Sequence, residues 1–196
     1  MKRLFDIFSS FIGIVVLLPV FFVIIMAVLV TMPGPIFFRQ IRVGKNQKLF
    51  KLNKFRTMTV QKGADYGHFD AGKNNRITSL GKILRKSKLD ELPQLFNVLV
   101  GDMSIVGPRP EVQKWTKVYP HKWEIVLTVK PGITDNASIH FRNEEVILAK
   151  SLNPEDTYRN EILPIKLDYY ISYVSKHSFF GDIIIIIKTM LKILTK

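Results

Sequence analysis

The pattern of hydrophobic and polar positions changes abruptly early in this chain. No charged residue occurs between Asp6 and Arg39, and residues 11–30 are almost wholly apolar. A helix rises ~1.5 Å per residue, so about 20 apolar residues match the ~30 Å hydrocarbon core of a bilayer. The pattern therefore predicts a membrane segment over residues 1–33 and a separate domain at the membrane surface over residues 34–196.

The path of this segment through the membrane is open from the residues alone. Pro19 lies near its middle, where it removes a backbone donor and bends or breaks a helix. Lys2 and Arg3 precede the segment and seven basic residues follow it, from Arg39 to Arg56, and such flanks favour the cytoplasm. A helix–break–helix that enters and leaves by one face satisfies both flanks, whereas a bent transmembrane helix satisfies only one. No small-x-small cleavage site follows, so we expect the segment to be retained.

The remaining chain predicts a mixed, helix-rich α/β domain. Residues 36–43 and 48–60 predict a β-hairpin around a turn with Gly44 and Asn46. The polar residues 61–75 predict a surface loop. Apolar side chains at helical spacing predict helices over residues 77–88 with a break at Gly81, 90–100 with a stop at Gly101, 143–150 and 158–176.

Three other segments have simpler patterns. Residues 107–111 and 129–134 contain Pro and Gly and predict rigid turns. The last residues, 179–196, fit either a buried strand or an interfacial amphipathic helix whose lysines reach back to water. These alternatives differ in whether the C-terminus belongs to the core or to the membrane surface.

The composition points to an anionic partner. The 196 residues include 29 Lys and Arg against 16 Asp and Glu, a formal net charge of +13, which favours nucleic acid, anionic lipid or a phosphorylated substrate. Because there is no cysteine, disulfides, thiolate catalysis and Cys-based zinc sites are excluded. Neither glycine-rich phosphate loop, G-x-x-x-x-G-K-[ST] or G-x-G-x-x-G, is present, and the four histidines lack metal-ligand spacing.

The adjacent acids Asp90 and Glu91 are the strongest candidates for chemistry. In the structural interpretation they begin a helix, where the macrodipole favours them and Ser87 forms a weak cap-like pattern with Asp90. The same placement would keep both carboxylates ionised, as a nucleophile or metal ligand requires. Basic residues surround the pair in the sequence. Together these features suggest phosphate chemistry with Mg²⁺, a hard cation that prefers oxygen ligands.

Candidate phosphate ligands also have structural alternatives. Arg109 lies between two prolines that restrict its backbone, which suits a guanidinium that binds phosphate through two hydrogen bonds. A structural ion pair fits Arg109 equally well. Lys54 and Arg56, on a predicted strand, fit either a phosphate site or a solvated face.

Three stretches carry a resemblance to a known family: KFRTM at 54–58, LRKSKLDELPQLFNVLVGDMSIVGPRPE at 84–111 and KPGIT at 130–134. They resemble the monotopic phosphoglycosyl transferases, small bacterial enzymes that begin glycan assembly on polyprenyl phosphate. The resemblance runs over nearly the whole chain, including the apolar segment with its central proline. It implies a re-entrant hairpin around Pro19 and an enzyme in the cytoplasmic leaflet of the bacterial inner membrane.

The resemblance also implies roles for individual residues. Asp90 would attack the β-phosphorus of a UDP-sugar, release UMP and hold the phosphosugar until a polyprenyl (undecaprenyl) phosphate attacks it. Glu91 would complete the catalytic pair, with Mg²⁺ at Asp90. Lys54, Arg85 and Arg109 match basic positions around the substrate phosphates. The implied partners are the UDP-sugar, the polyprenyl phosphate and membrane lipid, with downstream glycosyltransferases as candidates and no nucleic acid.

The chain departs from the family pattern at two places. Asp135 and Asn136 follow the PGIT turn where many members have Gly-Leu, which leaves sugar recognition open. Leu18 precedes Pro19 where a small polar residue is expected. One alternative function is a membrane-anchored, non-catalytic basic protein that binds anionic lipid or nucleic acid and is indifferent to Asp90→Asn. Another is a glycosyltransferase that moves a sugar without phosphate and releases UDP.

Overall fold

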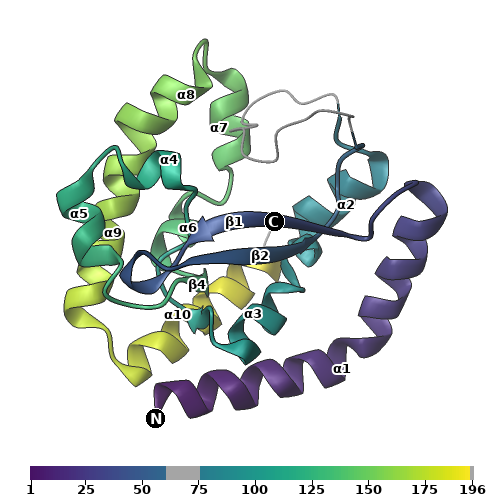
Figure 1. Cartoon of the computed structure of the whole chain (residues 1–196), viewed down its shortest axis with the longest axis horizontal. Coiled ribbons are helices and arrows are strands. Elements are labelled where there is room, and N and C mark those ends of the chain that lie inside the picture. Colours follow the sequence, from purple (N-terminus) through teal and green to yellow (C-terminus); the bar gives the residue numbers. More distant parts are fainter. Residues whose placement is uncertain (61–75, 195–196) are drawn as a thin grey trace.

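A computed structural model of the protein describes residues 1–60 and 76–194. The predicted surface loop over residues 61–75 lies outside the described residues. The elements confirm a mixed, helix-rich α/β fold with two small sheets (Figure 1). In chain order they are α1 (Lys2–Thr31), β1 (Phe37–Val43), β2 (Leu49–Phe55), α2 (Ser79–Ser87), α3 (Gln94–Val100), β3 (Ser104–Val106), α4 (Gln113–Thr116), α5 (Pro120–Val126), β4 (Gly132–Thr134), α6 (Asn136–His140), α7 (Glu144–Lys150), α8 (Pro154–Thr157), α9 (Leu163–Lys176) and α10 (Phe179–Leu194).

Helix α1 runs along the edge of the molecule and bends on the way (Figure 1). We expected a helix–break–helix at Pro19, but the helix is continuous and contains Pro19. A proline removes one backbone hydrogen bond, and bending is enough to relieve the clash of its ring with the preceding turn. By length and composition α1 is a candidate membrane span.

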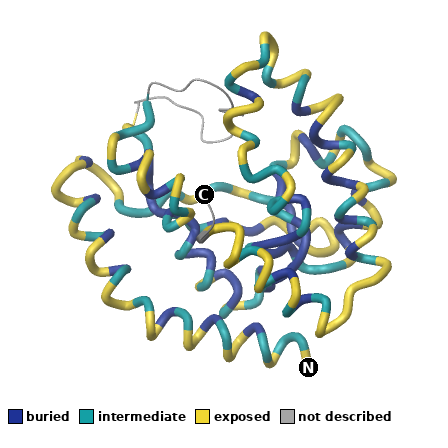
Figure 2. The backbone as a smooth tube through the Cα atoms, turned by 180° about the vertical axis from the view of Figure 1, so that it is seen from behind, coloured by how far each residue is buried: buried dark blue, intermediate teal, exposed yellow. Residues whose placement is uncertain are grey.

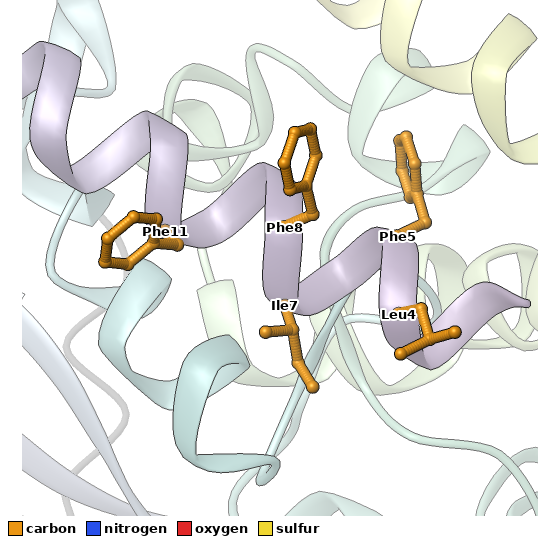
Figure 3. Close-up of a pocket in the computed structure, with 5 residues that line it drawn as sticks. All are labelled: Leu4, Phe5, Ile7, Phe8 and Phe11. Atoms are coloured by element: carbon orange, nitrogen blue, oxygen red, sulfur yellow. The ribbon is translucent and has the colours of Figure 1, made fainter.

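The two sides of α1 differ in exposure. Its buried positions recur every three to seven residues, so they lie on one face of the helix. Much of the rest of α1 is exposed (Figure 2), and its exposed side chains include the apolar residues Leu4, Phe8 and Phe22. Figure 3 shows the first turns, where Phe5 and Phe8 project to one side and Leu4 and Ile7 to the other. A helix with so much exposed apolar surface is suited to lipid contact.

Polar side chains at the start of α1 bind the domain. Arg3 donates to the carbonyls of Val98 and Leu99 at the end of α3, at 2.6 and 2.9 Å. Asp6 is buried and accepts hydrogen bonds from the Ser104 hydroxyl and the Ile105 amide, the latter at 3.0 Å. The charged start of α1 is therefore held against the domain through α3 and β3.

The other end of α1 binds the same domain. Arg56, just after β2, is buried and donates to the carbonyls of Met32 and Pro33, the latter at 2.8 Å. A cation is favourable at this position because the carbonyls at a helix C-terminus carry partial negative charge. Arg56 therefore caps α1 and does not lie on a solvated face. Both ends of α1 contact one globular body.

The predicted β-hairpin is confirmed. β1 and β2 pair antiparallel, with Phe37 opposite Phe55 and Val43 opposite Leu49. The connecting turn contains Asn46 in the left-handed region, at φ 52°. The hairpin positions Lys54 near the end of β2, on the side of the molecule where α2 and α3 lie.

A short parallel pair was missed by the sequence analysis. Residues 129–134 were expected to form only a turn, but β4 pairs with β3, with Ser104 opposite Gly132. The two backbones approach so closely beyond β3 that a Cβ on Gly132 would lie 2.1 Å from the Gly107 amide nitrogen. This contact supports the turn that carries Arg109.

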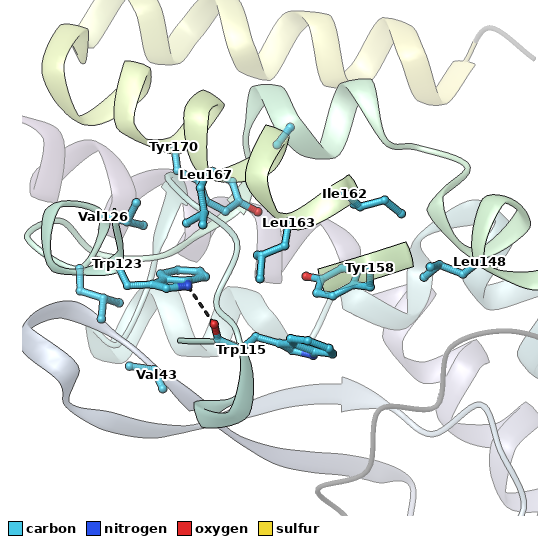
Figure 4. Packing of buried hydrophobic residues seen from close by; sticks show 12 residues of the cluster. Val43, Trp115, Trp123, Val126, Leu148, Tyr158, Ile162, Leu163, Leu167 and Tyr170 are labelled. Carbon is cyan, nitrogen blue, oxygen red and sulfur yellow. Dashed lines mark hydrogen bonds between the residues drawn. The ribbon is translucent and has the colours of Figure 1, made fainter. Parts of the chain in front are cut away.

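The largest hydrophobic cluster lies beneath α5 and α9 (Figure 4). Trp123 packs near Tyr170 and donates its indole N–H to the Trp115 carbonyl at 3.0 Å, which satisfies a buried donor. The cluster reaches Val43 at the end of β1. It thus joins the helical half of the domain to the hairpin.

The C-terminal segment forms helix α10, not a strand. Its apolar side chains Phe180, Ile184 and Ile187 are exposed. Asp182 is buried, accepts a hydrogen bond from Tyr173 at 2.9 Å and forms an ion pair with Lys2 at the start of α1. The amphipathic character fits an interfacial helix, and its position at the membrane stays a prediction.

The break predicted in α2 at Gly81 was wrong. The Thr78 side chain caps the helix by accepting from the Gly81 amide at 2.9 Å, and α2 continues to Ser87. Glycine is needed here for close approach, because a Cβ on Gly81 would lie 2.0 Å from the Thr57 carbonyl oxygen. α2 therefore packs directly on the backbone that follows β2.

Gly81→Ala should lower the free energy of unfolding by roughly 1–3 kcal/mol, because α2 must move away from Thr57. Helix propensity alone would predict the opposite, a more stable alanine variant, because it favours alanine over glycine. Thermal unfolding in detergent measures the effect, and Lys82→Ala at the exposed neighbouring position is the control. If Gly81→Ala is as stable as the control, the contact between α2 and Thr57 is wrong.

Candidate active site

The acid pair lies in a tight connection between two helices. α2 ends at Lys88, and Leu89–Glu91 form a single 3-10 turn before α3 begins at Gln94. The expectation that the pair opens a helix is therefore corrected to a turn that precedes α3. The cap-like pattern is also absent, since the Ser87 hydroxyl donates back into α2. Burial and the surrounding cationic side chains therefore act on the charge of the two acids.

Glu91 is the centre of a three-residue ion cluster. Lys54 Nζ donates to its Oε1 at 2.9 Å, and Arg109 donates to both carboxylate oxygens, Nη1 to Oε2 at 3.1 Å and Nη2 to Oε1. The two-pronged geometry is the one in which arginine binds carboxylate most strongly. The cluster joins β2, the 3-10 turn and the turn after β3.

The cations of this cluster keep Glu91 ionised. Burial acts to raise the pKa of Glu91, but the charges of Arg109 and Lys54 outweigh it and hold the pKa well below its ordinary value. In return, Glu91 raises the pKa of Arg109 well above its ordinary value. Burial lowers the pKa of Lys54 despite its pairing with Glu91. The net effect is a fixed carboxylate with two fixed cations.

Asp90 has the opposite environment. Only 6% of its surface is exposed, and its Oδ1 is buried without a hydrogen-bond partner among the described residues. Burial raises the pKa of Asp90 above its ordinary value, against the opposing charge of Lys54. A buried carboxylate oxygen without a partner is costly, and such groups usually have a reason connected with function. Of the two acids, Asp90 is the one available for chemistry.

Arg85 is the predicted site residue that does not bind the acids. Its Nε donates to the Thr57 hydroxyl at 3.0 Å, and its Nη1 pairs with Glu145 of α7 at 3.1 Å. Its charge still acts to lower the pKa of Asp90, so it lies at the rim of the site. Lys54, Asp90, Glu91 and Arg109 form the centre. Pro19 lies elsewhere, inside α1.

The sequence analysis missed a buried network behind Arg109. Glu111, two residues on, accepts from Tyr158 and from Lys166, the latter at 3.5 Å, and pairs with Arg42 Nη1 at 3.3 Å. Lys166 and Arg42 hold the pKa of Glu111 below its ordinary value, against burial, which acts to raise it. These partners lie far apart in the sequence, and only their position in the fold relates them. The network fixes the Arg109 turn between β1 and α9.

Asp90 is the residue of this site that could hold a magnesium ion. The described residues contain no group of three or more His, Cys, Asp or Glu side chains that could hold a metal. Because Glu91 is committed to Arg109 and Lys54, Asp90 is the available carboxylate. Mg²⁺ in phosphate-processing sites is commonly bound by one or two carboxylates together with phosphate oxygens and water. The unpartnered Asp90 Oδ1 satisfies that requirement.

Comparison with known proteins identifies the family. The family model described as "Bacterial sugar transferase" matches residues 1–196. The chain belongs to the bacterial sugar transferase family. Every residue of the ion cluster and its surroundings lies inside the match.

Three relatives are similar to this chain over nearly its whole length. The UDP-glucose:undecaprenyl-phosphate glucose-1-phosphate transferase of Klebsiella pneumoniae is 39% identical over 97% of this chain and 39% of its own length. The UDP-N-acetylgalactosamine-undecaprenyl-phosphate N-acetylgalactosaminephosphotransferase of Aeromonas hydrophila is 33% identical over 99% of this chain and 44% of its own. Exopolysaccharide production protein ExoY of Rhizobium meliloti (strain 1021) is 31% identical over 96% and 83%. The chain thus spans less than half the length of the first two relatives.

Glu91→Gln should destabilise the protein at neutral pH by about 3 kcal/mol, because Lys54 and Arg109 lose a buried counter-charge. The carboxylate's contribution is present above its unfolded pKa, near 4.5, and is lost as pH falls through the lower folded pKa. The stability gap between wild type and variant should therefore close in acid. Thermal unfolding in detergent from neutral pH to pH 3 measures it.

Glu145→Gln is the matched control for that experiment. Its partner is Arg85, but Glu145 is exposed, so we expect a change of only about 0–1 kcal/mol. A Glu91→Gln variant whose stability follows the wild-type curve at every pH would contradict the assignment of Glu91 as the centre of the cluster.

Proposed function

We propose that this chain transfers a phosphosugar from a UDP-sugar to a polyprenyl phosphate, releases UMP, and so begins the assembly of a bacterial glycan. The buried Asp90 oxygen without a partner, beside a carboxylate that is fully paired, carries the proposal. The two relatives named for transfer from UDP-glucose or UDP-N-acetylgalactosamine to undecaprenyl phosphate support this reaction class.

Asp90 acts as the nucleophile in the first of two displacements. Its carboxylate oxygen forms a bond to the β-phosphorus of the donor, and the bond from that phosphorus to the bridging oxygen breaks. UMP leaves with the bridging oxygen and the electron pair, and the phosphosugar stays on Asp90 as an acyl phosphate. Splitting the transfer lets a soluble donor and a lipid acceptor use the site in turn.

The polyprenyl phosphate takes the phosphosugar from Asp90 in the second displacement. An oxygen of the polyprenyl phosphate attacks the phosphorus held on Asp90, and the bond from phosphorus to Asp90 breaks. The product is a polyprenyl diphosphate sugar, and the carboxylate is regenerated. No external base is required, because both attacking groups are anions.

The ion cluster supplies the electrostatic part of catalysis. Phosphoryl transfer depends mainly on positioning and on neutralising charge. Arg109 and Lys54 are fixed on Glu91, the residue next to Asp90, so they need no reorganisation when the donor binds. When bound at Asp90 and the diphosphate, Mg²⁺ would neutralise phosphate charge. Arg85 at the rim would add a further positive charge.

The anchorage of α1 supports a re-entrant membrane position. Arg3 at its start and Met32 at its end both contact the same domain, through α3 and Arg56 respectively. A straight helix of 30 residues would be about 45 Å long, which is more than the thickness of the hydrocarbon core. If it crossed the membrane, its two ends would lie on opposite sides and could not both contact one domain. We therefore propose that α1 enters and leaves the cytoplasmic leaflet of the inner membrane, with the domain on the cytoplasmic face.

The enzymatic proposal is tested by UMP release from a panel of UDP-sugars, with detergent-solubilised protein, Mg²⁺ and undecaprenyl phosphate. Wild type should release UMP from at least one donor, and Asp90→Asn should reduce the rate roughly 10⁴-fold or more. Because the Asp90 side chain has no hydrogen bond or ion pair among the described residues that asparagine would break, the variant should keep its unfolding temperature. Release of UDP in place of UMP would contradict the transfer of phosphate with the sugar.

The membrane proposal is tested by cysteine labelling, which has no background because the chain lacks cysteine. A single cysteine is placed after Met1 in one variant and at Lys48 in another. Both should react with an impermeant maleimide in inverted membrane vesicles and be protected in intact spheroplasts. Labelling of the N-terminal cysteine from the outside of spheroplasts would indicate a spanning helix.

A further inference from the structure

The cations predicted to bind the donor already have protein partners. Lys54 and Arg109 both donate to Glu91, and Arg85 donates to Thr57 and Glu145. A diphosphate donor brings at least two further negative charges into this region. Because Lys54 and Arg109 are paired with Glu91, little positive charge remains to balance the diphosphate. The site therefore needs a further cation that is not already paired with a protein group.

Lys88 is such a cation. Its side chain is exposed, and within the described part of the chain it has no ion pair or side-chain hydrogen bond. Lys88 lies two residues before Asp90. Its carbonyl accepts a hydrogen bond from the Glu91 amide at 3.1 Å, which holds the Lys88 backbone against the turn that carries both acids. The charge of Lys88 acts against the burial that raises the pKa of Asp90, and it adds to the charges of Arg109 and Lys54 that hold down the pKa of Glu91. Its ammonium group therefore acts on both carboxylates.

The backbone of Lys88 adopts a conformation that favours glycine. It lies in the left-handed region, at φ 60° and ψ 13°, where it ends α2 and donates its amide to the Arg85 carbonyl at 3.2 Å. Helices that end this way usually have glycine or asparagine at the position, because a Cβ is disfavoured there. A lysine in such a conformation beside reactive groups suggests that its side chain has a use.

We propose that Lys88 is a further donor-binding residue, whose ammonium binds the diphosphate of the UDP-sugar above Asp90. This inference rests on the proposed function for the identity of the donor. The left-handed turn reverses the chain between α2 and the 3-10 turn. The Lys88 side chain is exposed, while its backbone bonds to α2 on one side and to the turn that carries both acids on the other.

The test compares three variants of the full chain in detergent. Lys88→Gln should raise the KM for the UDP-sugar roughly tenfold, with a smaller change in kcat, because a charged hydrogen bond to the diphosphate is lost. Lys88→Arg should stay near the wild-type KM, since it keeps the charge. Lys88→Gly should raise the KM like Lys88→Gln and yet raise the unfolding temperature by about 2–4 °C, because the left-handed conformation suits glycine.

Two control variants separate the charge from the backbone. Gln47→Gly removes a Cβ at the same kind of position, φ 62° in the hairpin turn, and should raise the unfolding temperature without changing the KM. Lys86→Gln removes an exposed lysine from the same segment and should leave the KM unchanged. A wild-type KM in Lys88→Gln and Lys88→Gly would overturn the proposal.

Calorimetric titration with inorganic pyrophosphate and Mg²⁺ decides the inference separately from turnover. Wild type should bind pyrophosphate roughly tenfold more tightly than Lys88→Gln. Equal affinity of the two proteins, or no binding by wild type, would overturn the role of Lys88. Failure of wild type to release UMP from any UDP-sugar would instead overturn the proposed function, and the titration would still report on Lys88.

Discussion

The pairing of Glu91 with Arg109 and Lys54 is the interaction on which the site depends. It joins three segments that approach each other only in the folded chain: the end of β2, the turn before α3 and the turn after β3. A buried carboxylate needs such partners, because burial alone would favour its protonated form. Two further contacts support the cluster: the Glu111 network behind Arg109 and the close packing of Gly81 on the backbone that follows β2.

The cluster also gives the two adjacent acids different environments. Glu91 receives the fixed cations and is kept ionised, whereas Asp90 stays buried with an oxygen that lacks a partner. Burial of an ionised carboxylate costs free energy, and a cation or a phosphorus atom that binds the carboxylate offsets part of that cost. The same arrangement leaves the centre nearly neutral before substrate binds, and the proposed contact of Lys88 with the diphosphate would supply the further positive charge.

Local features of the fold were predictable from the sequence, and long-range ones were not. The hairpin turn and the end of α3 at Gly101, with φ 100°, follow from turn chemistry and periodicity within a few residues. The parallel pairing of β3 with β4 is short and gives no periodic signal. The resemblance named the acids and the basic residues, but it did not indicate that Arg85 would bind Glu145. That contact depends on how α7 lies beside α2, which no local pattern encodes.

In the proposed reaction, Asp90 carries the phosphosugar between the two displacements. Intact-protein mass spectrometry after incubation with a UDP-sugar and Mg²⁺, without polyprenyl phosphate, tests it most directly. A covalent intermediate on Asp90 should appear as a mass increase of one sugar phosphate, located on the peptide that contains Asp90 and matched by an equal amount of UMP. Addition of polyprenyl phosphate should remove it. An adduct on another residue, or turnover that requires both substrates together without any adduct, would contradict the account.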